Sequence, residues 1–358
     1  MKTRKERFNR HIESLWTLKE TERRWHFPVL AGVCIGICLS VGQLLGQPML
    51  GNIASFGALV ILYFTHDTLE KRMLHLSVCA LGFMLAFSLQ LLFSFHPIPS
   101  LISFFVVTFL AHFLSSYFDI PPPRNFFFIM AAAVATQIPF DLNEIPSQLG
   151  MFSFGILVSV VLAFFYSVLV AKESKSYLRI RPRKNRYTKT VESFVLGLAM
   201  VLALIVGYTI DKESPYWVPV SALAVLQGKD LLHTTERNLH RVLGTFLGMG
   251  IAWIILSLKL SPWWMVLLIA SLQAIIELLI VRNYLFAVLF ITPLTILLAE
   301  TGRGFAVDTT ALIYARLIDT SLGAFIGLFT GYILHHKVWM DGLEKQVRKF
   351  KLLRKRTF

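Results

Sequence analysis

The hydrophobic positions of this chain fall into long apolar runs that are separated by short polar or charged stretches. A helix needs about 20 mostly apolar residues to cross the hydrocarbon core of a bilayer, so such runs predict membrane-spanning helices. In chain order the predicted spans cover residues 28–45, 51–65, 73–94, 99–117, 125–140, 148–171, 191–209, 216–228, 241–258, 262–280, 283–299 and 311–335. The pattern predicts an all-α polytopic membrane protein with about 12 transmembrane helices, three of them (51–65, 125–140 and 216–228) short.

The composition agrees with this interpretation. Hydrophobic residues make up 55% of the chain and charged residues 16%, whereas a soluble globular domain carries about a quarter charged residues. The three cysteines, Cys34, Cys38 and Cys79, all lie in apolar runs. We expect them to be small buried hydrophobes rather than the partners of a disulfide framework.

The placement of basic residues predicts the orientation of the chain. Eight Lys and Arg lie in the N-terminal tail, eight in the linker 172–190, eight in the C-terminal tail and seven in short loops on the same side. Only Lys212, Lys259 and Arg303 fall on the opposite side. Because cytoplasmic loops carry the excess of basic residues, both termini are predicted to be cytoplasmic. The net charge of +14 is therefore interpreted as membrane topology rather than as a nucleic-acid footprint.

Both tails have the pattern of a basic amphipathic helix. Their apolar positions are Phe8, Ile12, Leu15 and Trp16 in residues 1–26, and Met340, Leu343, Val347 and Phe350 in residues 336–358. Such helices bind anionic lipid at the membrane surface. The alternative is that each tail is simply solvated.

The chain contains an internal repeat. TLEKRMLHLSVCALG at 68–82 and TTERNLHRVLGTFLG at 234–248 share Thr, Glu, Leu and Gly in register, and Arg124-Asn125 is echoed by Arg282-Asn283. Matching at one long period indicates duplication. Because each half contains an even number of predicted spans, the two six-helix repeats, 27–171 and 191–335, are expected to be parallel.

Arg316 and Asp319 lie inside the last predicted span and are three residues apart, so they share one helical face. A charge inside the membrane is costly, and such residues face the bundle interior or water. Two structural explanations account for this pattern. Arg316 could extend its side chain to the membrane interface, or Arg316 and Asp319 could form a purely structural ion pair. The functional hypothesis is that Arg316 attracts an anionic substrate and Asp319 exchanges a proton.

The second span of each half is short and interrupted. In the second half it reads YWVPVSALAVLQG, with Tyr216, Trp217 and Ser221 beside Pro215 and Pro219. Short or Gly/Pro-interrupted spans at matching positions of two halves point to a transporter's binding site. An ordinary short helix is the alternative.

Charged residues gather at the predicted cytoplasmic ends of several spans. They are Arg237, His240 and Arg241, together with the recurring pairs Glu277 with Arg282 and Asp119 with Arg124. They are expected either to form interfacial ion pairs or to gather anions at an inner mouth.

Small residues recur every four positions in two spans. Gly244, Thr245 and Gly248 lie in one of them, and Gly323, Gly327 and Gly331 lie in the other. Glycine ridges let helix backbones touch in lipid, so these residues are expected to mark tightly packed helices.

These segments resemble the fusaric acid resistance-like family. The matching residues are Tyr216, Trp217, Arg241, Gly244, Thr245 and Gly248 in the first motif, and Arg316, Asp319, Thr320 and Gly323 in the second. The first half is a degenerate copy, with Val78 and Cys79 where the motif has Gly and Thr.

The resemblance implies anion translocation in the bacterial inner membrane. The family includes exporters of aromatic carboxylic acids that work with a periplasmic adaptor, and it is akin to plant aluminium-activated malate transporters. The partners expected are a small anionic substrate, protons, a periplasmic adaptor and a second copy of the chain.

Three functional hypotheses follow. The first is proton-coupled efflux of small organic carboxylates, aromatic ones among them. The second is a passive anion channel, and the third is a non-transporting membrane scaffold. No metal-ligand spacing, phosphate-binding loop or dinucleotide fingerprint is present, so neither an enzyme nor a cofactor is expected.

Overall fold

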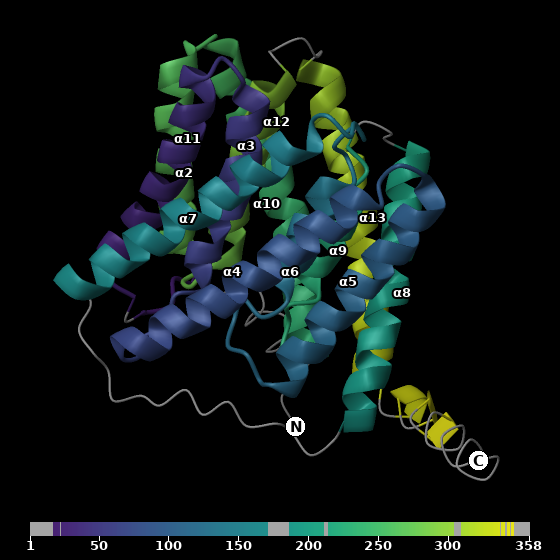
Figure 1. Cartoon of the computed structure of the whole chain (residues 1–358). Helices are drawn as coiled ribbons and strands as arrows, with labels where there is room; N and C mark the ends of the chain where they lie inside the picture. Colours follow the sequence, from purple (N-terminus) through teal and green to yellow (C-terminus); the bar gives the residue numbers. More distant parts are fainter. Residues whose placement is uncertain are drawn as a thin grey trace. The chain divides into compact units, whose positions relative to one another are not determined.

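The computed structural model describes residues 17–21, 23–170, 186–210, 214–303, 309–336, 338–340, 342–343 and 345–346. Every long element in these residues is a helix. In chain order the helices are α2 (His26–Leu44), α3 (Pro48–Ala58), the 3-10 helix η1 (Leu59–Tyr63), α4 (Leu69–Leu92), α5 (Pro97–Tyr117), α6 (Phe126–Ala135), α7 (Ile145–Leu169), α8 (Arg186–Ile210), α9 (Trp217–Val225), α10 (Leu231–Ser257), α11 (Pro262–Leu279), α12 (Tyr284–Arg303) and α13 (Thr309–His335) (Figure 1). The apolar positions predicted in the N-terminal tail, most of the basic linker, and Val347 and Phe350 lie outside the described residues.

Eight of these helices are long and apolar enough to cross a membrane, so the chain is a multi-pass membrane protein. They are α2, α4, α5, α7, α8, α10, α11 and α13. The other predicted spans also hold helices, but α9 has nine residues and α6 has ten. At 1.5 Å per residue, each covers only about half of the hydrocarbon core. The all-helical membrane class is confirmed, whereas the count of 12 spans stays a prediction.

Two helices that position the candidate site, α10 and α12, begin at side chains that bind backbone N–H groups. The N–H of His233 donates to Asp230 Oδ1 at 2.9 Å at the start of α10. The N–H of Leu285 donates to Asn283 Oδ1 at 2.8 Å at the start of α12. The first N–H groups of a helix have no partner within the helix, and these side chains satisfy one in each.

The helices form two compact units. The first consists of residues 1–64, 146–171 and 236–320. In this unit α2 packs along α11 and α3, and α3 also packs along α12 (Figure 1). Gly32 makes the approach of α2 to α11 possible, because a Cβ atom there would lie 2.5 Å from the carbonyl oxygen of Ala270. The side-chain amide of Asn52 donates to the carbonyl of Leu298 at 2.6 Å and ties α3 to α12.

The second unit consists of residues 65–145, 172–235 and 321–358. Here α5 packs along α8, α4 along α6, and α9 along α8 and α6. Gly197 of α8 lies against the ring of Phe105 on α5, where a Cβ would come within 2.8 Å of a ring carbon. Between α4 and α5, the amide of Gln90 donates to the hydroxyl of Ser100 at 2.9 Å. Polar side chains in this unit therefore bond one another across helices.

The two units repeat the same helix contacts when α2–α7 are matched in order with α8–α13. The pair α2 with α11 corresponds to α8 with α5, and α3 with α12 corresponds to α9 with α6. The pairs α2 with α3 and α11 with α12 likewise correspond to α8 with α9 and α5 with α6. Each unit therefore combines helices from both sequence halves, which no pattern in the sequence indicated.

The closest backbone approaches occur at glycines. A Cβ atom on Gly155 of α7 would collide with the carbonyl oxygen of Ala54 on α3, and one on Gly57 would collide with the carbonyl of Phe152. The hydroxyl of Ser159 also donates to the carbonyl of Ala58 at 2.6 Å. The backbones of α3 and α7 thus touch over two turns.

We expect Gly155→Ala to lower the free energy of unfolding by about 1–3 kcal/mol, because its methyl group must displace backbone. Gly150→Ala is the matched control in the same helix, since no heavy atom lies within 4 Å of its added Cβ. Thermal unfolding in detergent measures the difference. Equal melting temperatures for the two variants would contradict the close packing of α3 on α7.

Candidate functional site

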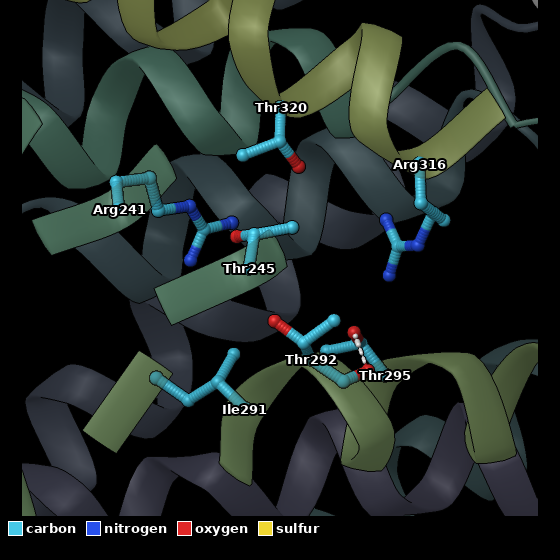
Figure 2. Close-up of a pocket in the computed structure, with 7 residues that line it drawn as sticks. All are labelled: Arg241, Thr245, Ile291, Thr292, Thr295, Arg316 and Thr320. Carbon is cyan, nitrogen blue, oxygen red and sulfur yellow. Dashed lines mark hydrogen bonds between the residues drawn. The ribbon is translucent and has the colours of Figure 1, made fainter. Parts of the chain in front are cut away.

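A small pocket opens where three helices of the first unit meet. Its lining residues are Arg241 and Thr245 of α10, Ile291, Thr292 and Thr295 of α12, and Arg316 and Thr320 of α13. Figure 2 shows the guanidinium groups of Arg241 and Arg316 on either side of Thr245. The pocket has room for about one water molecule.

Helical spacing explains why these side chains converge. Arg241 and Thr245 are four residues apart on α10, and Arg316 and Thr320 are four apart on α13. Residues at this spacing lie on one face of a helix. Each of the two helices therefore presents one guanidinium and one hydroxyl to the same space.

Glycines bring α10 close to α12 beside the pocket. A Cβ on Gly244 would lie 2.8 Å from Cβ of Val288, and one on Gly248 would lie 2.6 Å from the carbonyl oxygen of Leu289. Larger residues at either position would push α12 away from Arg241 and Thr245. The glycines predicted to mediate packing therefore hold the lining helices together.

The continuous helix α12 lacks one backbone hydrogen bond beside the pocket. Pro293 lies inside this helix, directly after Thr292. Because proline has no N–H, the carbonyl of Leu289 lacks its usual donor four residues on. Proline is tolerated inside membrane helices where neighbouring helices, side chains or water satisfy the freed carbonyl.

The pocket is cationic and rich in hydroxyl groups. Arg241 is 6% exposed and Arg316 is 5% exposed. The hydroxyl of Thr292 donates to the carbonyl of Val288 at 3.0 Å, and that of Thr295 donates to the carbonyl of Thr292 at 2.9 Å. A hydroxyl can rotate from such a backbone acceptor towards a ligand.

Asp319 is next to Thr320 in the chain and has no exposed surface, but it is not among the lining residues. The lining set carries two positive charges and no carboxylate. Guanidinium groups bind carboxylates through charge-assisted, often bidentate, hydrogen bonds. The arrangement is therefore suited to a carboxylate or another small oxoanion.

The structure gathers four of the predicted site residues around this pocket: Arg316, Thr320, Arg241 and Thr245. Arg241 was expected at an inner mouth, yet it lines the same space as Arg316. Sequence reasoning missed Ile291, Thr292 and Thr295. The sequence feature that could have identified Thr292 and Thr295 is their position beside Pro293 within an apolar run.

The predicted residues of α9 are all buried, and they lie in the second unit. The rings of Tyr216 and Trp217 are in contact, with centroids 4.3 Å apart and an interplanar angle of 40°. Ser221 packs against Gly323 of α13, where an added Cβ would come within 2.6 Å of the serine Cβ. Ser221 thus lies at a close contact between two helices.

The other glycines of α13 have similar surroundings in the second unit. A Cβ on Gly327 would lie 2.6 Å from the carbonyl oxygen of Ala222. One on Gly331 would lie 2.7 Å from the methyl group of Thr234. The row of glycines in α13 therefore allows α9 and the start of α10 to pack closely against α13.

The charged residues predicted for an inner mouth have partners that their spacing did not indicate. Glu277 binds the guanidinium of Arg23 at 2.8 Å, and Gln273 donates to the other carboxylate oxygen at 3.4 Å. The backbone carbonyl of Arg282 accepts a hydrogen bond from the N–H of Lys19 at 3.1 Å. The segment before α2 is thereby attached to α11 and to the turn that follows it.

The remaining members of that predicted set lie within α10 and between α5 and α6. Arg237 and His240 are in α10 beside Tyr284. Asp119 and Arg124 lie in the turn between α5 and α6, with φ angles of 52° and 49°. These are left-handed conformations that are uncommon outside glycine.

Comparison with known proteins supports a relationship in the second half of the chain. Residues 198–330 match the family model described as fusaric acid resistance protein-like. All seven pocket-lining residues lie within this range.

Two curated relatives are similar over part of the chain. The uncharacterized membrane protein YvaC of Bacillus subtilis is 34% identical over 184 residues, which are 51% of this chain and 27% of the relative. The uncharacterized protein slr1298 of Synechocystis is 34% identical over 140 residues, which are 37% of this chain and 18% of the relative. The matched regions are thus less than a third of the length of either relative. No solved structure is significantly similar to the chain.

The motifs around Arg241 and Arg316 lie inside the matched region, in helices that line one pocket of a multi-pass membrane protein. The part of the chain that holds the pocket, residues 198–330, is therefore similar to the fusaric acid resistance protein-like family.

Proposed function

We propose that this protein is a secondary transporter that moves small organic carboxylate anions out across the bacterial inner membrane, in exchange for protons. The observation that carries the proposal is the convergence of Arg241 and Arg316 with four threonine hydroxyls on one buried pocket. The location of that pocket within the family-matched residues supports it further.

In this proposal the two guanidinium groups bind the carboxylate of the substrate. Two positive charges in a protein interior repel each other, and an anion between them offsets that repulsion. The pocket, with room for about one water molecule, fits a carboxylate group better than a whole aromatic acid. We infer that the helices separate to admit the rest of the substrate, and Pro293, where α12 lacks one backbone hydrogen bond, is a suitable place for that movement.

Asp319 is the proposed proton carrier. Its carboxyl group is completely buried, and it follows Arg316 by three residues on α13. A neutral carboxylic acid is easier to bury than a carboxylate, so protonation and substrate binding would be linked there. A passive anion channel would need the same arginines but no proton at Asp319.

We also propose that all twelve helices form two parallel six-helix repeats with both termini in the cytoplasm. The matching helix contacts of the two units support the repeat. The concentration of Lys and Arg in the tails, linker and one set of loops supports the orientation.

We expect Arg316→Gln to reduce the kcat/KM of benzoate transport in proteoliposomes by at least about tenfold, because a charge-assisted hydrogen bond contributes about 1.5–3 kcal/mol. Arg24→Gln, at an exposed arginine, is the matched control and should transport normally. If R316Q folded normally and transported benzoate at the wild-type rate, Arg316 would not be part of the site.

We expect Asp319→Asn to abolish benzoate accumulation driven by a pH gradient while leaving benzoate–benzoate exchange measurable. The amide keeps the size of the side chain but cannot bind and release a proton. Uptake of labelled benzoate, with and without a protonophore, measures both activities. Undiminished uphill transport in D319N would place the coupling proton elsewhere.

We expect Thr292→Val to raise the KM for benzoate about fivefold with a smaller change in kcat, because it removes one hydroxyl worth about 1 kcal/mol at nearly constant volume. Thr209→Val is the control, since the exposed Thr209 also donates to a carbonyl of its own helix. Equal KM values for T292V and T209V would exclude the Thr292 hydroxyl from substrate binding.

A further inference from the structure

A second polar cluster lies one helical turn before the pocket on the same face of α10. Arg237 precedes His240 by three residues and Arg241 by four, so Arg237 shares a helix face with each of them. Both side chains contact Tyr284, the first residue of α12. Neither His240 nor Tyr284 lines the pocket described above.

The contacts within this cluster are aromatic and cationic. The guanidinium carbon of Arg237 lies 3.8 Å from the ring centroid of Tyr284, which is a close cation–π contact. The imidazole of His240 stacks on the same ring, with centroids 6.4 Å apart and an interplanar angle of 27°. The three side chains therefore hold one another in place.

Two polar atoms of the cluster are buried and have no hydrogen-bond partner among the described residues. They are the hydroxyl of Tyr284 and Nε2 of His240. The two residues are 9% and 8% exposed. A buried polar group that lacks a partner costs about 1–3 kcal/mol. Two such groups on touching rings leave two hydrogen-bonding atoms available to a ligand.

The surrounding charge favours an anionic ligand. Tyr284 stands at the N-terminus of α12, where the helix dipole is positive. The positively charged side chains near His240 are Lys19 and Arg237, and the nearby carboxylate is Glu236. The hydroxyl of Tyr284 and a protonated Nε2 of His240 can both donate hydrogen bonds.

We propose that Arg237, His240 and Tyr284 form a second carboxylate-binding subsite that hands substrate to the pocket at Arg241 and Arg316. The rise between Arg237 and Arg241 is about 6 Å, one step along the same helix face. The aromatic rings provide apolar surface that the pocket, with Ile291 as its one apolar lining residue, does not. The subsite is therefore matched to small aromatic carboxylates. Carboxylate binding here stands by itself, whereas its place in a transport path rests on the proposed function.

The test is equilibrium dialysis of radiolabelled benzoate against the full-length protein in detergent. Wild-type protein should bind two benzoates per chain, and Arg316→Gln should leave one. In the R316Q background, Tyr284→Phe should weaken the remaining site about tenfold, and His240→Gln should also weaken it. Tyr314→Phe, at a tyrosine that is 64% exposed on α13, is the matched control and should leave binding unchanged.

The subsite would be excluded if R316Q protein bound no benzoate saturably, or if Y284F and H240Q both bound it as tightly as Y314F. Size-exclusion chromatography of each variant identifies misfolding, and the two independent substitutions keep the result decisive if one of them fails to fold. Two-site binding without transport in proteoliposomes would contradict the proposed function but support this subsite.

Discussion

Close contact between helix backbones is the constraint on which the rest of this structure depends. Lipid tails are as apolar as leucine side chains, so helices in a membrane gain little from simple hydrophobic contact and associate through packing and hydrogen bonds. Here glycines allow that packing: Gly32 lies against Ala270, Gly155 against Ala54, and Gly323 against Ser221. The same device at Gly244 and Gly248 brings α10 against α12, and the pocket exists because those helices are held together.

The first unit also buries charged and polar side chains within this packing. Burying such a group away from water costs free energy. Arg241 and Arg316 are almost completely buried, and Asp319 has no exposed surface. A charge in such a place is retained when it performs a task that an apolar residue cannot. Binding an anion is the task that fits two guanidinium groups lining one small space. The buried hydroxyl of Tyr284 on α12 and Nε2 of His240 on α10 extend the same reasoning to a neighbouring part of the first unit.

The sequence was sufficient to predict the helices but not how they pair. Apolar runs located each helix of α2–α13 to within several residues for most ends, because burial in lipid imposes a length on every span. The pairing of α2 with α11 joins segments more than 200 residues apart, and no local pattern encodes it. No local pattern indicated the partner of Glu277 either. It is Arg23, 254 positions away, and the sequence had suggested Arg282, five positions away. Arg316 and Arg241 were found because a charge in or next to an apolar run is conspicuous. Thr292 and Thr295 were missed because threonine in a membrane helix usually just bonds its own backbone.

The central claim is that anions pass through the pocket between α10, α12 and α13. Its most direct test is thiol modification of Thr295→Cys in proteoliposomes, with Thr209→Cys as the exposed control; the native cysteines are all buried. The account predicts that an anionic methanethiosulfonate reacts at position 295 faster than a cationic one of similar size, that benzoate slows the reaction, and that modification stops flux. Faster reaction with the cationic reagent, no protection by benzoate and undiminished flux would contradict it.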